Sequence, residues 1–252
     1  MKGRALHGLF VPCALLAAWE ITARAGALPE FVLPAPSAVA LELVDMMKTG
    51  QLWLHLGASV VRVLVGFALG AVVGAVLGFG VGLDPRGEAL LDPTVQALRS
   101  VPSLAWVPLL LLWMGIGEAP KITLIAIGSF FPVYLNAIAG VRSTDRKLIE
   151  LGHIHGLPRL GIVRAVILPS SLPSLLTGLR TGLAVAWLYV VAAELMAAHA
   201  GLGFLLTDGR ELSRADLIFV AIVLLAGCGK ISDGILVRIE RRLLRWREEG
   251  GG

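Results

Sequence analysis

Long apolar stretches separated by short polar connectors dominate the pattern of this sequence. An apolar run of about 20 residues spans the hydrocarbon core of a bilayer as a helix. On this basis the pattern predicts membrane helices over residues 8–23, 59–83, 100–114, 122–141, 175–198 and 217–236. Charged residues or Gly and Pro bound each stretch. The third predicted helix contains Pro102 and Pro108, where we expect kinks because proline interrupts helical hydrogen bonding.

The composition agrees with a membrane protein. Hydrophobic residues make up 56% of the chain and charged residues 16%, and the mean hydropathy is +0.81. That leaves too little polar surface to solvate a globular domain of 252 residues. A transmembrane β-barrel would need strict polar alternation, which the sequence lacks. The predicted fold class is therefore all-α integral membrane, with about six helices in a single transmembrane domain over residues 1–252.

The Lys and Arg residues predict the orientation of these helices, because cytoplasmic connectors are enriched in them. With both termini inside, the inner side holds Lys2, Arg4, Arg86, Arg99, Arg142, Arg146, Lys147, Arg159, Arg164, Arg238, Arg241, Arg242, Arg245 and Arg247. The outer side holds Arg24, Lys48, Lys121, Arg210 and Arg214. This asymmetry predicts cytoplasmic termini, and it attributes the net charge of +4 to topology and not to nucleic-acid binding. The first apolar stretch also has features of a signal peptide, but Glu20, Thr22 and Arg24 favour its retention.

Several kinds of chemistry find no support in the sequence. Cys13 and Cys228 lie in apolar stretches without a metal-ligand pattern, so we expect buried thiols and neither a disulfide nor a metal site. His153 and His155 are expected to be solvated loop residues. A GxSxG elbow, an HExxH motif and a phosphate-binding GxxxxGK[ST] loop are all absent. The chain is therefore predicted not to be an enzyme and to hold no cofactor of its own.

Glycine recurs every four residues in the second predicted helix, at Gly66, Gly70, Gly74 and Gly78. Such a stripe lets two helix backbones approach closely in lipid. The partner helix belongs either to the same chain or to a second subunit, and the sequence leaves both open.

Charged residues inside the apolar stretches require partners. Lys230 and Asp233 are three apart on one helix, so we predict an ion pair between them. Glu20 has no obvious partner. Glu194, near the outer end of the fifth predicted helix with Tyr189 a turn away, either lines a translocation path or reaches the outer interface. Arg62 and Arg180 are candidates to attract an anion, or else reach the interface in the same way.

The cytoplasmic connector over residues 143–170 carries a distinctive spacing. Glu150, Gly156, Leu168 and Pro169 fit the pattern EAA, three residues, G, nine residues, I-x-LP, with Val166 at the Ile position. Leu151 and Gly152 replace the two alanines. This segment resembles the signature loop of ABC importer permeases. Residues 33–43, 99–121 and 168–206 and the tail LVRIERRLLRWRE resemble the nitrate, sulfonate and taurine branch of that family.

The resemblance implies the permease subunit of a bacterial inner-membrane ABC importer of type I. By this resemblance, two copies of the permease chain would form the translocation path within membrane lipid. Cytosolic ATPase subunits would bind ATP and Mg²⁺, and an extracytoplasmic binding protein would deliver a small anion such as a sulfonate, taurine or nitrate. The connector over residues 200–214 is a candidate surface for that binding protein.

The residues of the connector agree with an ATPase-coupling role. We predict a short helix from Leu148 to His155 that ends at Gly156, because Gly terminates helices and Pro158 follows. Leu148, Leu151 and His155 fall on one face of it and are candidates for docking. We call the connector of residues 143–170 the elbow. ATP-driven closure of the partner ATPase would then move the elbow as a rigid body. The rival hypothesis is an ion-coupled carrier or channel, although the expected inverted repeat is not found.

Overall fold

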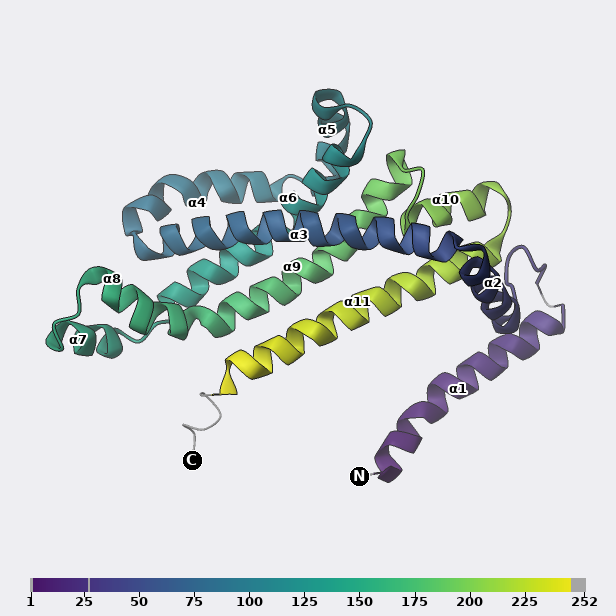
Figure 1. Cartoon of the computed structure of the whole chain (residues 1–252), viewed down its shortest axis with the longest axis horizontal. Helices are drawn as coiled ribbons and strands as arrows, with labels where there is room; N and C mark the ends of the chain where they lie inside the picture. The colour runs from purple at the N-terminus through teal and green to yellow at the C-terminus, as the bar shows by residue number, and fades with distance from the viewer. Residues whose placement is uncertain (1, 27, 246–252) are drawn as a thin grey trace. The chain divides into compact units, whose positions relative to one another are not determined.

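A computed structural model describes residues 2–26 and 28–245 (Figure 1). Within that range every regular element is a helix, as the sequence predicts. The α-helices are α1 (Lys2–Arg24), α2 (Pro36–Thr49), α3 (Gln51–Leu83), α4 (Pro85–Ser100), α5 (Val107–Met114), α6 (Glu118–Arg142), α7 (Arg146–Ile154), α8 (Arg159–Ile162), α9 (Leu168–Ala197), α10 (Leu202–Glu211) and α11 (Ala215–Leu243). A 3₁₀ turn, η1 (Ser103–Trp106), precedes α5, and a π-helical turn, η2 (Val163–Ile167), joins α8 to α9.

Four helical stretches in the described part are long and apolar enough to cross a membrane. They are Gln51–Leu83, Glu118–Arg142, Arg159–Met196 and Ala215–Leu243, which contain the second, fourth, fifth and sixth predicted spans almost entirely. α4 together with Leu104–Met114 would make a fifth if this pair, bent by 83°, counts as one span. The first predicted span lies in α1, which is helical but is not among these apolar stretches. The all-α membrane fold is thus confirmed with four to five such spans.

The third predicted span differs from the structure. It was expected to be one kinked helix over residues 100–114, but the chain is extended at Val101 and Pro102, where ψ is 122° and 123°. A residue before proline disfavours helical geometry, which explains the break. The connector before it, which contains Arg86 and Arg99, forms the polar helix α4, which the sequence did not predict. Asp84 caps that helix by accepting a hydrogen bond from the Arg86 backbone N–H at 2.9 Å.

The chain forms two compact units. The first comprises residues 1–59 and 198–227, and in it α1 and α2 are joined through Glu20. The Glu20 carboxylate accepts hydrogen bonds from the backbone N–H of Ser37 at 3.0 Å and from its hydroxyl at 2.7 Å. Glu20 therefore satisfies a free N–H in the first turn of α2, a partner that the sequence did not reveal.

The same unit fixes the start of α10. His55 and Ser59, both buried in α3, accept hydrogen bonds from the backbone N–H groups of Gly201 at 3.2 Å and Leu202 at 2.8 Å. Arg214, just before α11, pairs with Glu42 and Asp216. The hydrogen bond to Asp216 is the largest of the effects that raise the pKa of Arg214 above its usual value. The two thiols were expected to be buried, but Cys13 is exposed and Cys228 is half-buried, since apolar helix faces of a membrane protein also point to lipid.

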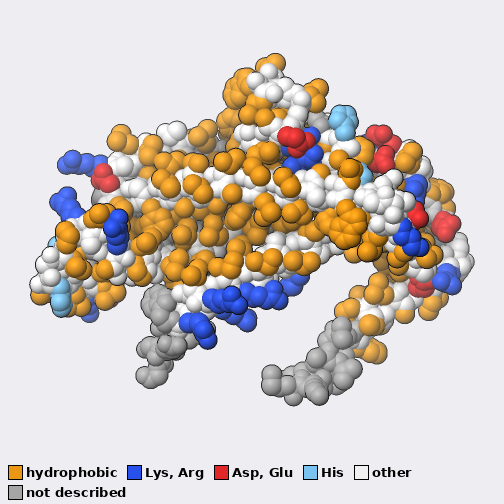
Figure 2. All heavy atoms as spheres, viewed as in Figure 1, with side chains coloured by type: hydrophobic (Ala, Val, Ile, Leu, Met, Phe, Trp, Pro, Cys, Tyr) orange, Lys and Arg blue, Asp and Glu red, His pale blue; other side chains and the backbone are white. Residues whose placement is uncertain are grey.

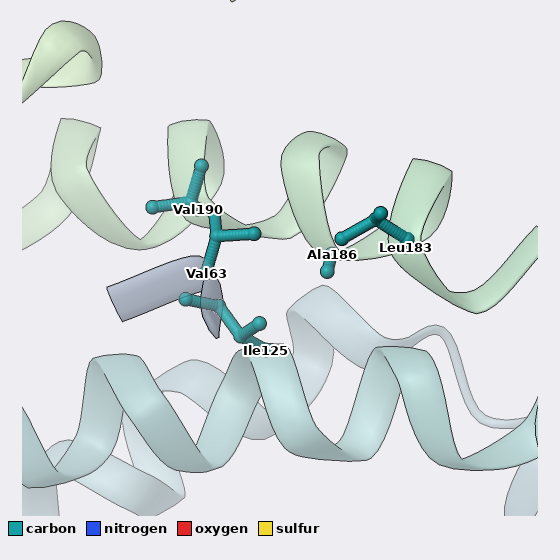
Figure 3. Packing of buried hydrophobic residues seen from close by; sticks show 5 residues of the cluster. All are labelled: Val63, Ile125, Leu183, Ala186 and Val190. Atoms are coloured by element: carbon teal, nitrogen blue, oxygen red, sulfur yellow. The ribbon is translucent and has the colours of Figure 1, made fainter. Parts of the chain in front are cut away.

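The second unit comprises residues 60–197 and 228–252 and holds the main core. Figure 3 shows Val63 of α3, Ile125 of α6 and Leu183, Ala186 and Val190 of α9 directed toward one another. All five are at most 6% exposed. In Figure 1, α6 and α9 run side by side, which agrees with their extensive contacts. This core holds three apolar helices of the same chain together.

The glycine stripe of α3 faces α6. A Cβ added at Gly66 would lie 2.7 Å from Ile125, and one at Gly74 would lie 2.8 Å from the Phe130 carbonyl oxygen. Cβ atoms at Gly70 and Gly78 would likewise meet α6, at Ala126 and Tyr134. Of the two partners that the sequence left open, the structure places a helix of the same chain against the stripe.

Candidate functional site

The connector with the EAA-like spacing begins as a capped helix. Asp145 precedes α7 with extended backbone, and its side chain accepts a hydrogen bond from the Lys147 backbone N–H at 2.9 Å. This is an N-cap, because the carboxylate satisfies an N–H that has no partner within the helix. α7 thus starts two residues before the predicted Leu148.

The end of α7 depends on Gly156. There the backbone turns into the left-handed region, with φ of +72°, which glycine adopts without steric cost. The Gly156 N–H donates to the His153 carbonyl at 2.9 Å and the Leu157 N–H to the Gly152 carbonyl at 3.1 Å. These bonds satisfy carbonyls of the last turn, and Pro158 is the N-cap of α8, which begins at Arg159. The predicted helix end at Gly156 agrees with this geometry.

One side of the elbow is anchored to the rest of the unit. Gly152 is buried against Ile162, and a Cβ added there would lie 3.3 Å from Cγ1 of that residue. Ile162 forms an apolar cluster with Val141 of α6 and Ile167, and Phe79 of α3 packs against it. The elbow is therefore attached to the ends of the long helices.

The other side of the elbow is exposed and apolar. Leu148 and Leu151 are 45% and 49% exposed, although both are leucines. With His155 they line a surface hollow on the second unit. Its other lining residues are Gly152, Leu157, Ala165, Val166, Pro169 and Ser170. The three residues predicted as a docking face thus lie together with Pro169.

Two other residues of the motif lie apart from this hollow. Glu150 is exposed on α7 and does not line it, and Leu168, which is 46% exposed, does not line it either. Both histidines of the connector are exposed, as expected. His153 lies in α7 and His155 caps it, and their Nδ1 atoms lie 2.9 Å and 2.8 Å from the carbonyls of Ile149 and Leu151. No group of residues suited to hold a metal ion occurs in the described part of the chain.

The elbow continues into a single long helical stretch from Arg159 to Met196. Its π-helical turn has a local cause. Pro169 has no N–H to donate to the Ala165 carbonyl, and the Leu168 N–H instead bonds to the Val163 carbonyl. The stretch thus connects the elbow without a break to α9, on which Arg180, Tyr189 and Glu194 lie.

At the far end of α9 lies a cluster of charges in which Arg62, Lys121 and Glu194 are buried and Glu118 is exposed. The Glu194 carboxylate, which is 0% exposed, lies 2.7 Å from Nη1 of Arg62. Arg62 also binds Glu118 through two nitrogens, at 2.5 Å and 2.7 Å, and Lys121 approaches Glu118 at 3.0 Å. Glu194 and Arg62 are thus partners of each other, and α3, α6 and α9 meet in this cluster. Arg62 as the partner of Glu194 could not be identified from sequence spacing.

Arg180 lies in a second polar contact, between α9 and α11. Its side chain pairs with Asp233 at 3.0 Å and with Glu240 at 3.2 Å. The predicted pair of Lys230 with Asp233 is wrong, because the carboxylate turns toward the guanidinium of the packed helix. Trp187 adds a hydrogen bond of 2.9 Å to Ser232 in the same seam.

Tyr189 lies among hydrophobic residues of two core clusters. Its ring covers Gly128 of α6, where an added Cβ would lie 2.5 Å from Cδ2. This position makes Tyr189 a packing residue between α9 and α6 in the structure.

Comparisons with known proteins agree with these features. Residues 66–245 match the family of binding-protein-dependent transport system inner membrane components. The putative aliphatic sulfonates transport permease protein of Bacillus subtilis is 39% identical over 247 residues, which cover 98% of this chain and 90% of that protein. The taurine transport system permease protein of Escherichia coli is 36% identical over 240 residues, which cover 93% and 87%.

A solved structure shows the same fold. The MetNI methionine ABC transporter, in inward facing conformations, superposes with a TM-score of 0.62 at 24% identity over 79% of this chain and 98% of that one. The long apolar helices and the elbow define an integral membrane permease of the type I importer fold. The chain belongs to the family of binding-protein-dependent transport system inner membrane components. It is therefore a transport component of an ABC importer.

Proposed function

We propose that this permease couples to a separate cytosolic ATPase through the elbow of residues 143–170, and that its substrate is a small organic sulfonate. The observation that carries the coupling proposal is the exposed apolar face of α7. Leu148 and Leu151 line a surface hollow to which Pro169 of α9 also contributes. Exposed leucines around a concave surface favour burial in a partner protein. ATP and Mg²⁺ bind to that partner in this proposal, and this chain holds no cofactor.

The charges around the elbow support the same partner. Arg146, Lys147, Arg159 and Arg164 are all exposed, and Figure 2 shows basic side chains and histidines gathered at α7 and α8. Such a rim attracts an acidic surface and increases the rate of association. The ATPase is thus expected to present an apolar groove with acidic edges.

A pair of variants on α7 tests the docking face. Leu151→Asp adds a charge beside the hollow, whereas Ile154→Asp adds the same charge at a residue of α7 that is 78% exposed and does not line the hollow. We expect Leu151→Asp to reduce recovery of the ATPase with the purified permease by about tenfold or more, as for a central interface residue. Ile154→Asp should retain recovery. Equal recovery of the ATPase with both variants would show that the hollow is not part of the interface. Substrate uptake in the absence of any ATPase would favour an ion-coupled carrier.

The substrate proposal rests on relatives whose names share one chemical group. The B. subtilis relative is named for aliphatic sulfonates and the E. coli relative for taurine, which is itself a sulfonate. We propose that an extracytoplasmic binding protein delivers a sulfonate to this permease. Uptake of labelled taurine and ethanesulfonate by cells that carry the permease and its neighbouring genes tests this. Competition by unlabelled sulfonate but not by nitrate is expected, and the reverse would contradict the proposal.

The assembly and orientation are part of the same proposal. Two copies of this chain form the translocation path in the bacterial inner membrane, with both termini in the cytoplasm. The binding protein docks on the outer connector of residues 200–214, which includes α10. Cysteines placed at Ser143 and Ser213, both exposed, test the orientation in a chain without its native cysteines. An impermeant thiol reagent added to intact cells should label position 213 and not 143.

A further inference from the structure

The C-terminal half of α11 carries a basic surface that the coupling proposal does not use. Exposed cations of this half are Lys230, Arg238, Arg241 and Arg242, and Arg245 follows in the helical turn just after the end of α11 at Leu243. At about 100° per residue these five positions fall within roughly one third of the helix circumference. We call them the α11 basic face. Figure 2 shows basic side chains gathered along the lower edge of α11.

The α11 basic face points away from the rest of its unit. The opposite side of the helix contacts α9 through Ser232, Asp233 and Glu240. Leu236, on the same side, packs on the core. The two acids of this half therefore pair inward with Arg180. Among residues 2–26 and 28–245, no ion pair involves a cation of the α11 basic face. Its charge is not neutralised by the described part of the chain.

The length of α11 places most of this face beyond the hydrocarbon core. About 20 helical residues cross that core, and counted from Ala215 they end near residue 234. The four arginines, from Arg238 to Arg245, follow within about 16 Å of helix, which is the depth of the headgroup layer and the adjoining water. Lys230 lies earlier, but its long side chain can extend toward the same layer.

Exposed apolar residues flank the α11 basic face. Ile231, Ile235 and Ile239 recur every four residues beside it and are 65%, 49% and 41% exposed. A soluble acidic partner would account for the arginines but not for this apolar stripe. A lipid satisfies both, because its acyl chains cover the isoleucines and its headgroup meets the guanidinium groups.

We propose that the α11 basic face binds the headgroups of anionic phospholipids in the cytoplasmic leaflet. This rests on the proposed orientation, in which the end of α11 is cytoplasmic. The negative potential of that leaflet attracts clustered Lys and Arg, and it does so only within about a Debye length of the surface. Because Arg180 ties α11 to α9, the bound lipid also fixes the inner end of the helix that continues from the elbow.

The test compares lipid preference in two variants of equal charge. The full-length permease with its ATPase partner is placed in vesicles of phosphatidylcholine and phosphatidylglycerol in equal parts. The association of spin-labelled phosphatidylglycerol relative to spin-labelled phosphatidylcholine is then measured. One variant is R238Q/R241Q/R242Q, and the control is R86Q/R99Q/R142Q, whose arginines are also exposed and predicted to be cytoplasmic but lie outside the proposed ATPase-docking rim. Thermal unfolding verifies that both are folded.

We expect the α11 variant to lose the preference for phosphatidylglycerol by about tenfold, and the control to retain most of it. Added salt should weaken the wild-type preference. An unchanged preference in the α11 variant, or an equal loss in both variants, would overturn the proposal. Loss of the ATPase or of a second copy with lipid preference intact would assign the face to a protein partner. Thiol labelling at residues 143 and 213 separately reports a failure of the proposed orientation.

Discussion

Arg62 on α3 and Glu194 on α9 form an ion pair of 2.7 Å in which the two side chains are 7% and 0% exposed. Both charges lie in helices that are long and apolar enough to cross a membrane, so neither can obtain full solvation from water. The attraction between the two opposite charges offsets part of the desolvation cost of burying each side chain. The pair joins helices that are more than 100 residues apart along the chain.

Removal of one member should be strongly destabilising. We expect Arg62→Gln to lower the free energy of unfolding by about 3 kcal/mol or more, because it leaves the buried Glu194 carboxylate without this partner. Thermal unfolding of the purified permease measures this. As a matched control, Arg24→Gln should cost about 1 kcal/mol or less, since Arg24 is 69% exposed in its pair with Glu20. Similar losses in the two variants would mean that burial of the Arg62 pair has little energetic effect.

At Gly156 the backbone conformation, and not the available space, should decide the effect of a substitution. Nothing lies within 4 Å of an added Cβ, but φ is +72°. Gly156→Ala should therefore lower the free energy of unfolding by about 1–2 kcal/mol. Gly156→Trp should lower it by a similar amount, because the larger side chain meets no additional steric conflict there. Both should weaken the stimulation of ATPase activity by the loaded binding protein. Gly57→Ala in α3, where an added Cβ meets nothing within 4 Å and φ is not positive, is the control and should be neutral or slightly stabilising. Loss of ATPase stimulation in Gly156→Trp but not in Gly156→Ala would show that the space beside Gly156 must stay open, for example for the ATPase partner.

The contact of α3 with α6 predicts different effects for two glycines of one helix. A Cβ at Gly70 would clash with the Ala126 carbonyl and the Ser129 hydroxyl, whereas one at Gly80 meets nothing within 4 Å. We expect Gly70→Ala to destabilise the permease by about 1–3 kcal/mol through forced separation of the helices. Gly80→Ala should be neutral or slightly stabilising. Equal melting temperatures for the two variants would contradict the packing of α3 on α6.

Two variants can distinguish a structural role of Arg180 from a role in substrate binding. If its role is to tie α9 to α11, Arg180→Gln and Asp233→Asn should have similar small effects, about 1 kcal/mol or less, because the pair is partly exposed. The KM for sulfonate uptake should then change equally little in both. A large rise in KM for Arg180→Gln alone would instead identify Arg180 as a group that attracts the anion.

Local signals were sufficient to predict the elbow. A glycine followed two residues later by a proline is a local signal for a helix end, and Gly156 and Pro158 provide it after α7. The spacing of Leu148, Leu151 and His155 placed these residues on one face of the helix, and in the structure they line the same hollow. Hydropathy likewise located the long apolar helices. Both signals act within a few turns of one helix, so they can be recognised without knowledge of the tertiary structure.

Partners across helices could not be predicted. The rule for residues three apart paired Lys230 with Asp233, but Arg180 of the neighbouring helix competes for the same carboxylate and takes it. α4 was missed because its sequence is too polar to be recognised as a membrane helix. The acceptor role of Glu20 at the start of α2 depends on how two helices pack, which no sequence spacing encodes.

The helical stretch from Arg159 to Met196 is about 57 Å long, from 38 residues at 1.5 Å each. The elbow lies at one end of this stretch and the Arg62–Glu194 pair near the other. The core around Ala186 holds this stretch nearer its Met196 end, so a tilt imposed at the elbow would move Glu194 in the opposite direction and by a smaller distance. On this mechanical view, the stiffness of the helical stretch and the position of the pivot at Ala186 determine how much motion reaches Glu194.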